Sequence, residues 1–327
     1  APHDRRSAGG DRLRRLPPRP LMGIPRGTVR LLLDEARARP FRGSLLELGR
    51  MSVYATRREL EQWAREQVTP LSPAGDLALS HQPELAAAGC LDDRSFFRLL
   101  GCERVESADV SDWEGADHIL DLNLPVPAQL AGRYDTVFEA GTIQHVFDLP
   151  QVFANLHALL REGGRVIHGM APSTNHVDHG FYMFSPTLFH DFYTANGWRI
   201  EAEYFFEFFP YWFRGRFHST PWKIRRYTPG CLDHLAYGGF GARQVALFVV
   251  ATKAEGATAD RIPQQSYFSR FHGERRMGTG TDFSAHSSVG RLEESVPVPN
   301  FLLKLKEWKQ RLRRLAPRRL PPVEKRY

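Results

Sequence analysis

Hydrophobic and polar residues follow two different periodicities along the central part of the chain. Apolar residues recur every three or four positions from Val29 to Ala36, before Pro40, and again from Val152 to Leu160. Between such stretches lie short, nearly continuous apolar runs that are bounded by glycine, proline or acidic residues. Runs of this length are typical of strands that are buried on both faces. The pattern therefore predicts helices and strands that alternate.

Seven strands are predicted. They are expected at residues 44–49, 104–109, 118–122, 134–140, 165–170, 198–206 and 244–252. Helix starts are marked by residue pairs that cap a first turn or begin it with proline. These pairs are Thr56 with Glu59, Asp148 with Gln151, and Ser185 with Pro186. Gly163 should end the second of these helices and Gly197 the third. Five strand–helix repeats and two late strands predict an α/β fold with an open, doubly wound, mostly parallel seven-stranded sheet and helices on both faces.

The composition is that of an ordinary globular protein. The chain has 327 residues, of which 42% are hydrophobic and 25% are charged. Collagen, coiled coil and full disorder are excluded. We predict one elaborated domain with extensions at both ends. The predicted parts are a basic disordered segment at 1–20, the α/β domain at 21–253 with an aromatic insertion at 205–243, a flexible tether at 254–298, and a basic amphipathic helix with a tail at 299–327.

The net charge of +7 is unevenly distributed. Residues 1–20 carry +4 and residues 301–327 carry +8, which leaves −5 on residues 21–300. Because phosphate contacts need positive charge on the folded surface, an acidic body argues against a fold that grips nucleic acid. The chain has no apolar run long enough to cross a membrane, and its three cysteines form no CxxC pair. We therefore predict a cytoplasmic protein.

The C-terminal region shows an amphipathic pattern. Its apolar residues are spaced 4-3-4-3, which lines one face of a helix that Pro317 ends. They are Phe301, Leu305, Trp308, Leu312 and Leu315, with Lys and Arg at most other positions. This face would pack on the body, or bind a membrane surface, nucleic acid or a partner helix. We predict peripheral contact with an anionic membrane or with a partner protein.

The most specific stretch runs from Tyr134 to Gly169. It reads YDTVFEAGTIQHVFDLPQVFANLHALLREGGRVIHG, which gives a strand, a loop, a capped helix, two glycines and a second strand. Together with the strand order, this stretch resembles the class I S-adenosylmethionine-dependent methyltransferases, over roughly Leu45 to Thr252. The resemblance implies a seven-stranded Rossmann-like domain, S-adenosyl-L-methionine as cofactor, and methyl transfer as the activity.

The resemblance also implies cofactor-binding residues. Glu47 and Gly49 resemble the motif after the first strand, Asp109 the acid that binds the ribose, Asp121 the acid on the adenine side, and Glu139 with Gly141 the start of the segment after the fourth strand. One departure stands out, because the usual glycine-rich loop reads LELGRMSVYAT, with Gly49 alone. Arg50 and Met51 bring side chains into a place where glycine allows close approach. The alternative function is therefore a non-catalytic Rossmann-like binding or scaffold protein.

The catalytic residues are expected downstream of the fifth strand. There the chain reads HGMAPSTNHVDHGFYMFSP, at an edge that should face the cofactor. His is the usual side chain for removing a proton near neutral pH. We predict His179 or His176 as general base, with Asp178 orienting it and His145 as the competing base.

The acceptor should be bound by polar residues nearby and by the aromatic insertion. Asn175, Tyr182 and Arg214 are the predicted acceptor-binding residues. The segment from Phe205 to Trp222 is unusually aromatic and would stack on a flat acceptor or a sugar ring, or else form a hydrophobic cap or dimer surface. The predicted reaction is O-methylation of a small-molecule hydroxyl or of a sugar or glycan precursor. A nucleic-acid methyltransferase is disfavoured by the acidic body.

The histidine-rich segment would also suit a divalent metal. His176, Asp178 and His179 lie within four positions, and His145 or Asp148 would supply a third ligand. Methyl transfer from a sulfonium needs no metal, because the protein mainly aligns the two reactants. We therefore predict no metal ligand, while the spacing leaves the metal site open as an alternative.

Overall fold

A computed structural model of the chain describes residues 23–73, 75–213, 216–235, 240–266, six residues between 301 and 309, and 320–327, with the backbone alone at 210–213 and 216–219. The helices are α1 (Arg26–Ala38), α2 (Arg57–Glu66), α3 (Pro83–Ala87), α4 (Asp93–Leu100), α5 (Leu149–Leu159) and α6 (Pro186–Ala195), with 3₁₀ turns η1 (Ala128–Leu130), η2 (Ile143–His145) and η3 (Asp233–Leu235). The strands are β1 (Gly23–Ile24), β2 (Ser44–Leu48), β3 (Ser52–Val53), β4 (Arg104–Asp109), β5 (His118–Ile119), β6 (Tyr134–Glu139), β7 (Leu160–Thr174), β8 (Arg199–Phe208), β9 (Pro210–Phe213), β10 (Arg216–Ser219), β11 (Lys223–Arg226), β12 (Gln244–Thr252) and β13 (Lys325–Arg326). The segment predicted at 1–20 and most of the tether and of the C-terminal helix lie outside the described residues.

Nine strands form one mixed sheet in the order β13-β11-β8-β12-β7-β6-β2-β4-β5. The strands from β5 to β7 are parallel, whereas β12 is antiparallel to both of its neighbours. The predicted α/β fold is confirmed, but a sheet of seven mostly parallel strands is wrong. Two further strands extend one edge, because β11 pairs with β8 and the C-terminal β13 pairs with β11.

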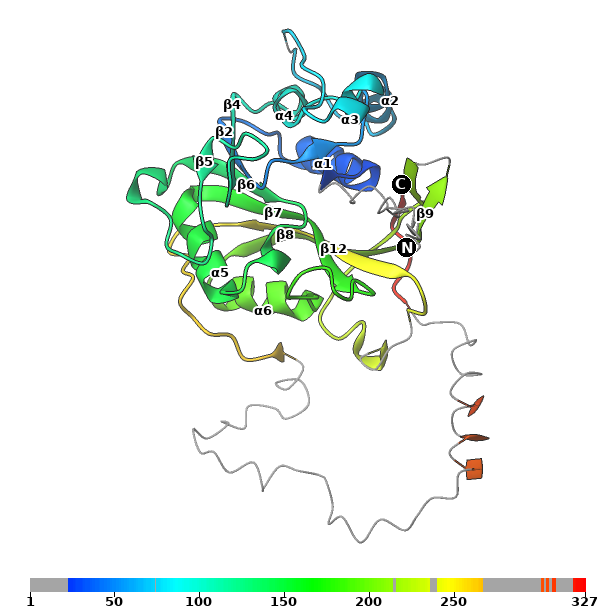
Figure 1. Cartoon of the computed structure of the whole chain (residues 1–327). Helices are drawn as coiled ribbons and strands as arrows, with labels where there is room; N and C mark the ends of the chain where they lie inside the picture. The colour runs from blue at the N-terminus through cyan, green and yellow to red at the C-terminus, as the bar shows by residue number, and fades with distance from the viewer. Residues whose placement is uncertain are drawn as a thin grey trace, which may run out of the picture.

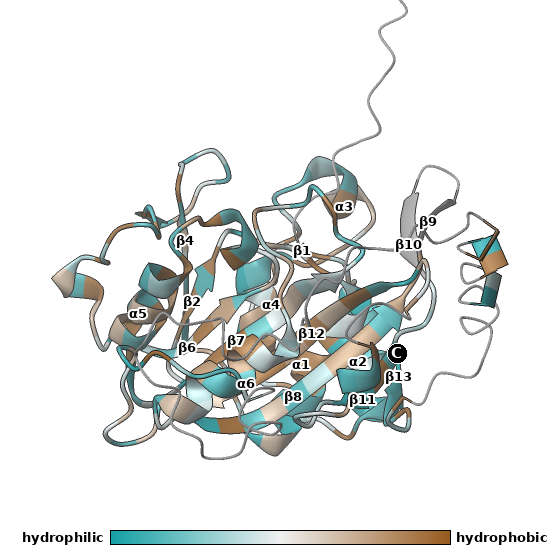
Figure 2. Ribbon diagram, turned by 90° about the horizontal axis from the view of Figure 1, so that it is seen from below, coloured by the Kyte–Doolittle hydropathy of each residue, from teal (hydrophilic) through white to brown (hydrophobic). Residues whose placement is uncertain are grey.

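Helices cover both faces of the sheet, as predicted (Figure 1). Successive side chains of a strand point to opposite faces, so neighbouring apolar residues enter different cores. Leu45 lies in the core that contains residues of α1 and α4, whereas Leu46 lies in the core that contains residues of α5 and α6. The hydrophobic residues follow the central strands when the molecule is seen from below (Figure 2). Burial on both faces explains why the strands read as continuous apolar runs.

The predicted helix starts are confirmed. Thr56 and Glu59 form a complete capping box at the start of α2. The Asp148 side chain accepts a hydrogen bond from the backbone N–H of Gln151 at 3.1 Å and so caps α5. Each bond satisfies a backbone donor that has no partner within the first helical turn.

Predicted boundaries are wrong at the third strand, at the helix before the fifth strand, and at the fifth strand itself, which runs from Leu160 to Thr174. The strand expected at 118–122 ends at Ile119, because the chain turns where the carboxylate of Asp121 accepts the N–H of Asn123 at 2.9 Å. The helix expected to end at Gly163 ends at Leu159, and β7 begins at the next residue. The N–H of Gly163 donates to the carbonyl oxygen of Lys253 at 2.8 Å, so pairing next to β12 replaces the helix stop.

α4 was not predicted, although its ends are clearly marked. The Asp92 side chain accepts a hydrogen bond from the N–H of Ser95 at 2.7 Å, and Gly101 ends the helix in the left-handed region with φ of 115°. Asp93, at the start of α4, lies 3.5 Å from Arg50, which follows β2. The N-terminus of α4 therefore lies beside the carboxyl end of β2.

The C-terminal strand β13 and the residue after it contact α1 through the carboxylate of Asp34. Lys325 Nζ lies 2.6 Å from its carboxylate, and the Tyr327 hydroxyl donates to the same group. Burial raises the pKa of Asp34, but hydrogen bonds from Lys325, Tyr327 and Gln67 outweigh it and lower that pKa. The predicted basic tail therefore ends as a paired strand of the sheet.

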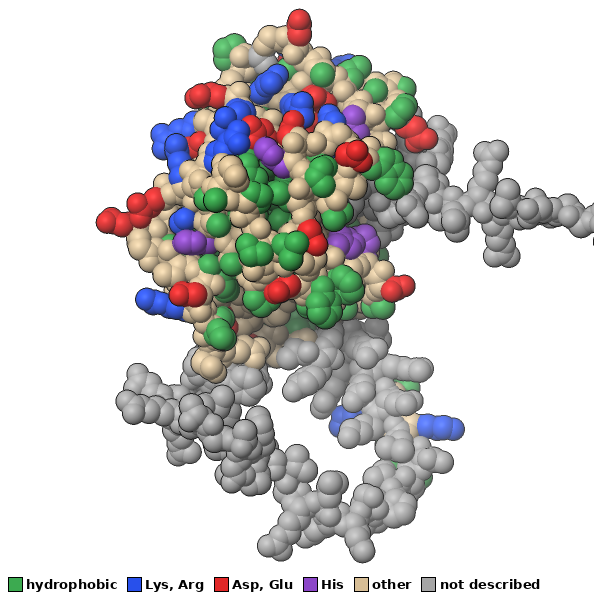
Figure 3. Space-filling view, turned by 60° about the vertical axis from the view of Figure 1, so that its left-hand side comes forward, with side chains coloured by type: hydrophobic (Ala, Val, Ile, Leu, Met, Phe, Trp, Pro, Cys, Tyr) green, Lys and Arg blue, Asp and Glu red, His purple; other side chains and the backbone are tan. Residues whose placement is uncertain are grey.

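The described surface mixes charges. On the face drawn in Figure 3, Lys and Arg side chains gather in the upper part and are interspersed with Asp and Glu. Of the predicted C-terminal helix, Phe301, Leu305 and Trp308 are exposed. Within the described part of the chain, every helix is too short or too polar to span a membrane.

Candidate functional site

The strand order reverses between β2 and β6. From β2 the chain moves outward through β4 and β5, and it then returns to β6 on the other side of β2. In open α/β sheets, ligands bind at such a reversal, beyond the carboxyl ends of the strands. These strands end at Leu48, Asp109, Ile119 and Glu139. The candidate site is this edge together with the loops that follow β2, β4, β6 and β7.

The loop after β2 is shaped by Gly49. Its φ of 78° lies in the left-handed region, and its N–H donates to the carbonyl oxygen of Ala108 at 2.7 Å. Arg50 then reaches sideways, and its Nη1 donates to the carbonyl oxygen of Glu114 at 2.9 Å. Met51 is fully buried in the core. Met51 therefore leaves the crevice free, while Arg50 links the end of β2 to the loop after β4.

Glu47 lies at this point within β2. Its side chain is fully buried, and its carboxyl group forms a side-chain hydrogen bond with that of Asp93. Burial, and then the neighbouring carboxyl of Asp93, raises the pKa of Glu47 well above its usual value. The side chain is thus at the predicted edge, where it is paired with a second buried acid.

The two acids predicted to bind the nucleoside both lie at this edge. Asp109 is the last residue of β4, is half-buried, and its Oδ1 accepts the N–H of Ser111 at 3.2 Å. Asp121 lies beyond β5 and is exposed, and the N–H and side-chain amide of Asn123 lower its pKa. Asp109 is therefore the better placed of the two for a ligand that enters the crevice.

Glu139, the last residue of β6, positions the loop that follows this strand. Its carboxylate accepts hydrogen bonds from the N–H groups of Gly141 at 3.0 Å and Thr142 at 3.1 Å. Its other oxygen lies 2.8 Å from Nδ1 of His168, whose Nε2 lies 2.7 Å from the Tyr193 hydroxyl. Burial raises the pKa of Glu139, but His168 and the two N–H groups outweigh it and lower that pKa. Both oxygens of Glu139, which was predicted to bind the cofactor, are thus hydrogen-bonded within the protein. Glu139 would affect the cofactor indirectly, by positioning the loop after β6.

Three predicted histidines are brought together. His145 comes from η2 after β6, whereas His176 and His179 come from the loop after β7. The ring centroids of His145 and His179 are 5.3 Å apart, and those of His176 and His179 are 6.4 Å apart. His145 and His179 are exposed, and His176 is half-buried. A cluster of imidazoles therefore lies at the carboxyl edge.

The histidines differ as bases. Burial, and then the neighbouring His179, lowers the pKa of His176 to about 4. The same two causes lower the pKa of His145. Because a general base works best when its pKa lies near the working pH, His176 is a weak choice. His179, between the other two rings and open to solvent, is the best placed.

The predicted acceptor-binding residues have other partners. Asn175 has a φ of 62°, and its Nδ2 donates to the carbonyl oxygens of Gly241 and Arg243 at 2.8 and 2.6 Å. The Tyr182 hydroxyl donates to the carbonyl oxygen of Phe147 at 2.6 Å. Both side chains therefore stabilise the loop after β7. Their oxygen atoms could still accept hydrogen bonds from the molecule that is methylated.

The predicted orientation of a histidine by Asp178 is not seen. Asp178 is exposed, with a φ of 63°, and it accepts no hydrogen bond from His176 or His179. The predicted Arg214 lies outside the described residues.

Exposed apolar side chains border the histidines. Phe147 and Phe181 form an edge-to-face pair with ring centroids 5.5 Å apart, although 70% and 64% of their surfaces are exposed. Val177 and Met183 are also exposed. Sequence reasoning missed these residues, as well as Asp93 and the 84% exposed Trp113 that follows Asp109. The available signal was a large apolar residue within a loop that otherwise reads as polar.

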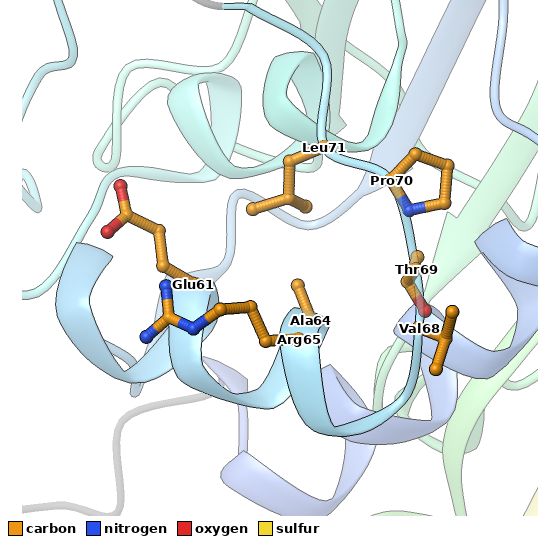
Figure 4. A pocket seen from close by; sticks show the side chains of 7 residues that line it. All are labelled: Glu61, Ala64, Arg65, Val68, Thr69, Pro70 and Leu71. Carbon is orange, nitrogen blue, oxygen red and sulfur yellow. The ribbon is translucent and has the colours of Figure 1, made fainter.

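Two cavities lie near the described elements. One, of about 390 Å³, is lined by Thr174 of β7 and by Met183, Phe184, Tyr227 and Phe240, so it adjoins the loop that carries His176 and His179. The other, of about 550 Å³, is lined by residues 61, 64, 65 and 68–71 at the end of α2 (Figure 4). Because no strand contributes to the second cavity, it is separate from the sheet edge.

The described residues contain no group of three His, Cys, Asp or Glu side chains placed to hold a metal ion. The alternative of a metal at His176, Asp178 and His179 thus has no geometric support among them. The neutral forms of His145 and His176 are instead favoured, because burial and the neighbouring His179 lower the pKa of both side chains.

Comparisons with known proteins give distant structural matches alone. No protein-family model matches the chain, and no curated protein sequence matches it. A provisionally assigned methyltransferase of Bacillus halodurans is 10% identical, with a TM-score of 0.39, over 69% of this chain and 98% of that protein. The 1,6-didemethyltoxoflavin-N1-methyltransferase of Burkholderia thailandensis, solved with that substrate and S-adenosylhomocysteine, is 16% identical, with a TM-score of 0.30, over 69% of this chain and 76% of that protein.

A third match is the trans-methyltransferase CalH, which was solved with S-adenosylhomocysteine. It is 14% identical, with a TM-score of 0.33, over 69% of this chain, which spans 54% of its length. Because these similarities are loose, we base the functional proposal on the strand order and on the residues of the site.

Proposed function

We propose that the chain is a class I S-adenosylmethionine-dependent methyltransferase that transfers a methyl group to a hydroxyl of a small-molecule acceptor. The observation that carries this proposal is the strand order, with a reversal between β2 and β6 and with β12 inserted antiparallel beside β7. This is the order of the class I methyltransferase sheet, and it agrees with the sequence resemblance. Fold alone does not establish function, so the site residues must also suit the cofactor.

The residues at the edge fit S-adenosylmethionine. Glu47 and Asp93 place two neighbouring carboxyl groups at the end of β2, which would suit a cationic group of the ligand. Asp109 uses one carboxylate oxygen for Ser111, which leaves the other for a ribose hydroxyl. Trp113, exposed in the same loop, offers an aromatic face to a flat base. Asp121 would stay at the outer border on the adenine side, because it is exposed.

When bound, the cofactor supplies an electrophilic methyl group on a sulfonium. The protein then has to align the acceptor, exclude water and take up a proton. The Glu139 carboxylate fixes the backbone of Gly141 and Thr142, and Thr142 Oγ1 in turn donates to the carbonyl oxygen of Leu48 at 2.5 Å. The loops after β2 and β6 are therefore held together at the reversal point. His179 would accept the proton of the acceptor hydroxyl.

The surroundings of His179 favour an acceptor with an apolar or ring-shaped part. Phe147 and Phe181 present exposed ring faces and edges beside the imidazoles. The adjoining cavity, lined by Phe184, Tyr227 and Phe240, has room for a small molecule. A sugar ring, as in a glycan precursor, or a phenol would stack there.

A second candidate function rests on Arg50. This side chain occupies a position where a glycine would leave room, and it is bonded to Glu114 across the edge. A Rossmann-like binding or scaffold protein that no longer takes the cofactor would retain the fold and such a link. The two functions differ in one measurable property, which is affinity for the cofactor.

Replacing Asp109 with alanine tests the proposed function. We expect it to weaken S-adenosylhomocysteine binding by about tenfold to a hundredfold, because a charge-assisted hydrogen bond to the ribose is lost. Isothermal titration calorimetry measures the affinity, and Asp112→Ala, an exposed acid in the same loop, is the matched control. Equal affinity of the wild-type protein and both variants would contradict the assignment of Asp109.

A further inference from the structure

Gln144 joins the two loops that carry the predicted histidines. It lies in η2, directly before His145, and 1% of its surface is exposed. Its side-chain amide donates to the carbonyl oxygen of Gly141 at 2.6 Å, and its own carbonyl oxygen accepts the N–H of Phe181 at 2.7 Å. Gly141 is itself fixed, because its N–H donates to the Glu139 carboxylate at 3.0 Å. Gln144 is therefore bonded both to the loop after β6 and to the loop after β7.

The loop after β7 comes closest to Gln144 at Gly180. A Cβ atom at Gly180 would lie 2.7 Å from Cγ and 2.8 Å from the carbonyl oxygen of Gln144, which is closer than side chains tolerate. The φ of Gly180 is 100°, in the left-handed region that favours glycine. The absence of a side chain at Gly180 therefore allows the two loops to pack together.

This contact lies directly beside two imidazole rings. His179 precedes Gly180, and His145 follows Gln144. The two rings are arranged edge to face, with centroids 5.3 Å apart. The distance between the rings therefore depends on the contact between their neighbours in the chain.

The other anchors of the loop lie further from His179. Asn175 binds backbone carbonyl groups at the start of the loop, and Tyr182 binds one just after it. Gln144 Oε1 is buried and has no hydrogen-bond partner among the described residues. Because an unpaired buried acceptor is unfavourable, the contact depends on close packing, and a change on either side should open it.

We propose that Gln144 is a positioning residue, whose contact with Gly180 holds His179 in place at the carboxyl edge. The inference rests on the proposed function, in which His179 is the general base. A general base has to lie within hydrogen-bond reach of the hydroxyl that it deprotonates. Because the His179 side chain is exposed, the packing of its loop sets its position.

The titration of His145 reports the position of His179. Burial, and then the neighbouring His179, lowers the pKa of His145, whereas Glu139 raises it. When the loop after β7 moves away, both lowering causes weaken, so the pKa of His145 rises towards its ordinary value of 6.5. Proton–carbon NMR of the imidazole C–H groups measures this titration in the full-length chain without any ligand, and His145→Gln identifies the signal.

We expect Gln144→Ala and Gly180→Ala to raise the pKa of His145 to a similar extent, because they open the same contact from opposite sides. His179→Ala should raise it as well, since one of the two lowering causes is removed. Adding His179→Ala to Gln144→Ala should give no further rise, because His179 has already left the ring of His145.

Each variant has a matched control. Gln67→Ala also removes an amide that donates to a backbone carbonyl oxygen, that of Arg30 at 2.8 Å, in another part of the fold. Gly132→Ala also places alanine at a positive φ, of 63°, but with open space around the new Cβ atom. Both controls should leave the titration of His145 unchanged.

Unchanged titration of His145 in folded Gln144→Ala and Gly180→Ala, or a further rise when His179→Ala is added to Gln144→Ala, would overturn the inference while the proposed function stands. Calorimetry with S-adenosylhomocysteine separates the two, since Gln144→Ala should bind it as tightly as the wild-type protein does. A folded wild-type protein that binds no S-adenosylhomocysteine would overturn the proposed function and, with it, the role of Gln144 in methyl transfer.

Discussion

Replacing Glu139 with alanine is expected to lower the free energy of unfolding by about 3 to 5 kcal/mol, because three buried hydrogen-bonding groups lose their partner. Glu139 and His168 are both 0% exposed and lie 2.8 Å apart, and the Glu139 carboxylate also accepts the N–H groups of Gly141 and Thr142. Urea denaturation followed by circular dichroism measures the change. The control is Glu61→Ala, which removes an exposed ion pair with Arg57 and should change stability by less than about 1 kcal/mol.

The effect of Glu139 should depend on pH in a defined direction. The folded pKa of Glu139 lies below its unfolded value, so its contribution is present above about pH 4.5 and is lost as the pH falls through the folded pKa. The difference between the wild-type protein and Glu139→Ala should therefore shrink on acidification. A difference that stays constant from pH 7 to pH 3 would show that loss of packing, and not loss of the Glu139 carboxylate, explains the change.

Replacing His179 with alanine is expected to lower kcat about a hundredfold or more, while cofactor binding stays the same. His179 lies between His145 and His176 and is exposed at the edge where the methyl group would be presented. The rate of S-adenosylhomocysteine formation, with an acceptor that the wild-type protein turns over, measures the loss. Calorimetry with S-adenosylhomocysteine checks that the cofactor site is intact.

The neighbouring histidines serve as matched controls. His176→Ala should lower kcat much less, because a base with a pKa of about 4 binds a proton weakly at pH 7. His145→Ala distinguishes the competing assignment, since a larger loss there than in His179→Ala would move the role of base to the loop after β6. A His179→Ala variant with the same kcat as the wild-type protein would contradict the assignment of His179 as the general base.

The sequence predicted those features that depend on local patterns. Apolar runs located the central strands, and capping pairs located the starts of α2 and α5. Long-range pairing was not predictable in this way. β13 joins the sheet because Lys325 and Tyr327 bind Asp34, about 290 positions away, and no local pattern encodes such a contact. The same reason explains why nine strands were taken for seven.

The sequence likewise predicted only some residues of the candidate site. The histidines at 145, 176 and 179 were placed near one another because loops after neighbouring parallel strands meet at one edge. The role of Glu139 was harder to read, since its partner His168 lies 29 positions away and within a strand. Asp93 was invisible because α4 was not recognised, and its closeness to Glu47 depends on how that helix packs.

Hydrogen–deuterium exchange with and without S-adenosylhomocysteine tests most directly whether the loops after β2, β4 and β6 bind a nucleoside together. We expect slower exchange at residues 49–51, 110–117 and 140–147, and no change along α2 beside the separate cavity. Exchange that is unaltered at all three loops under saturating ligand, or slowed only near α2, would contradict the account.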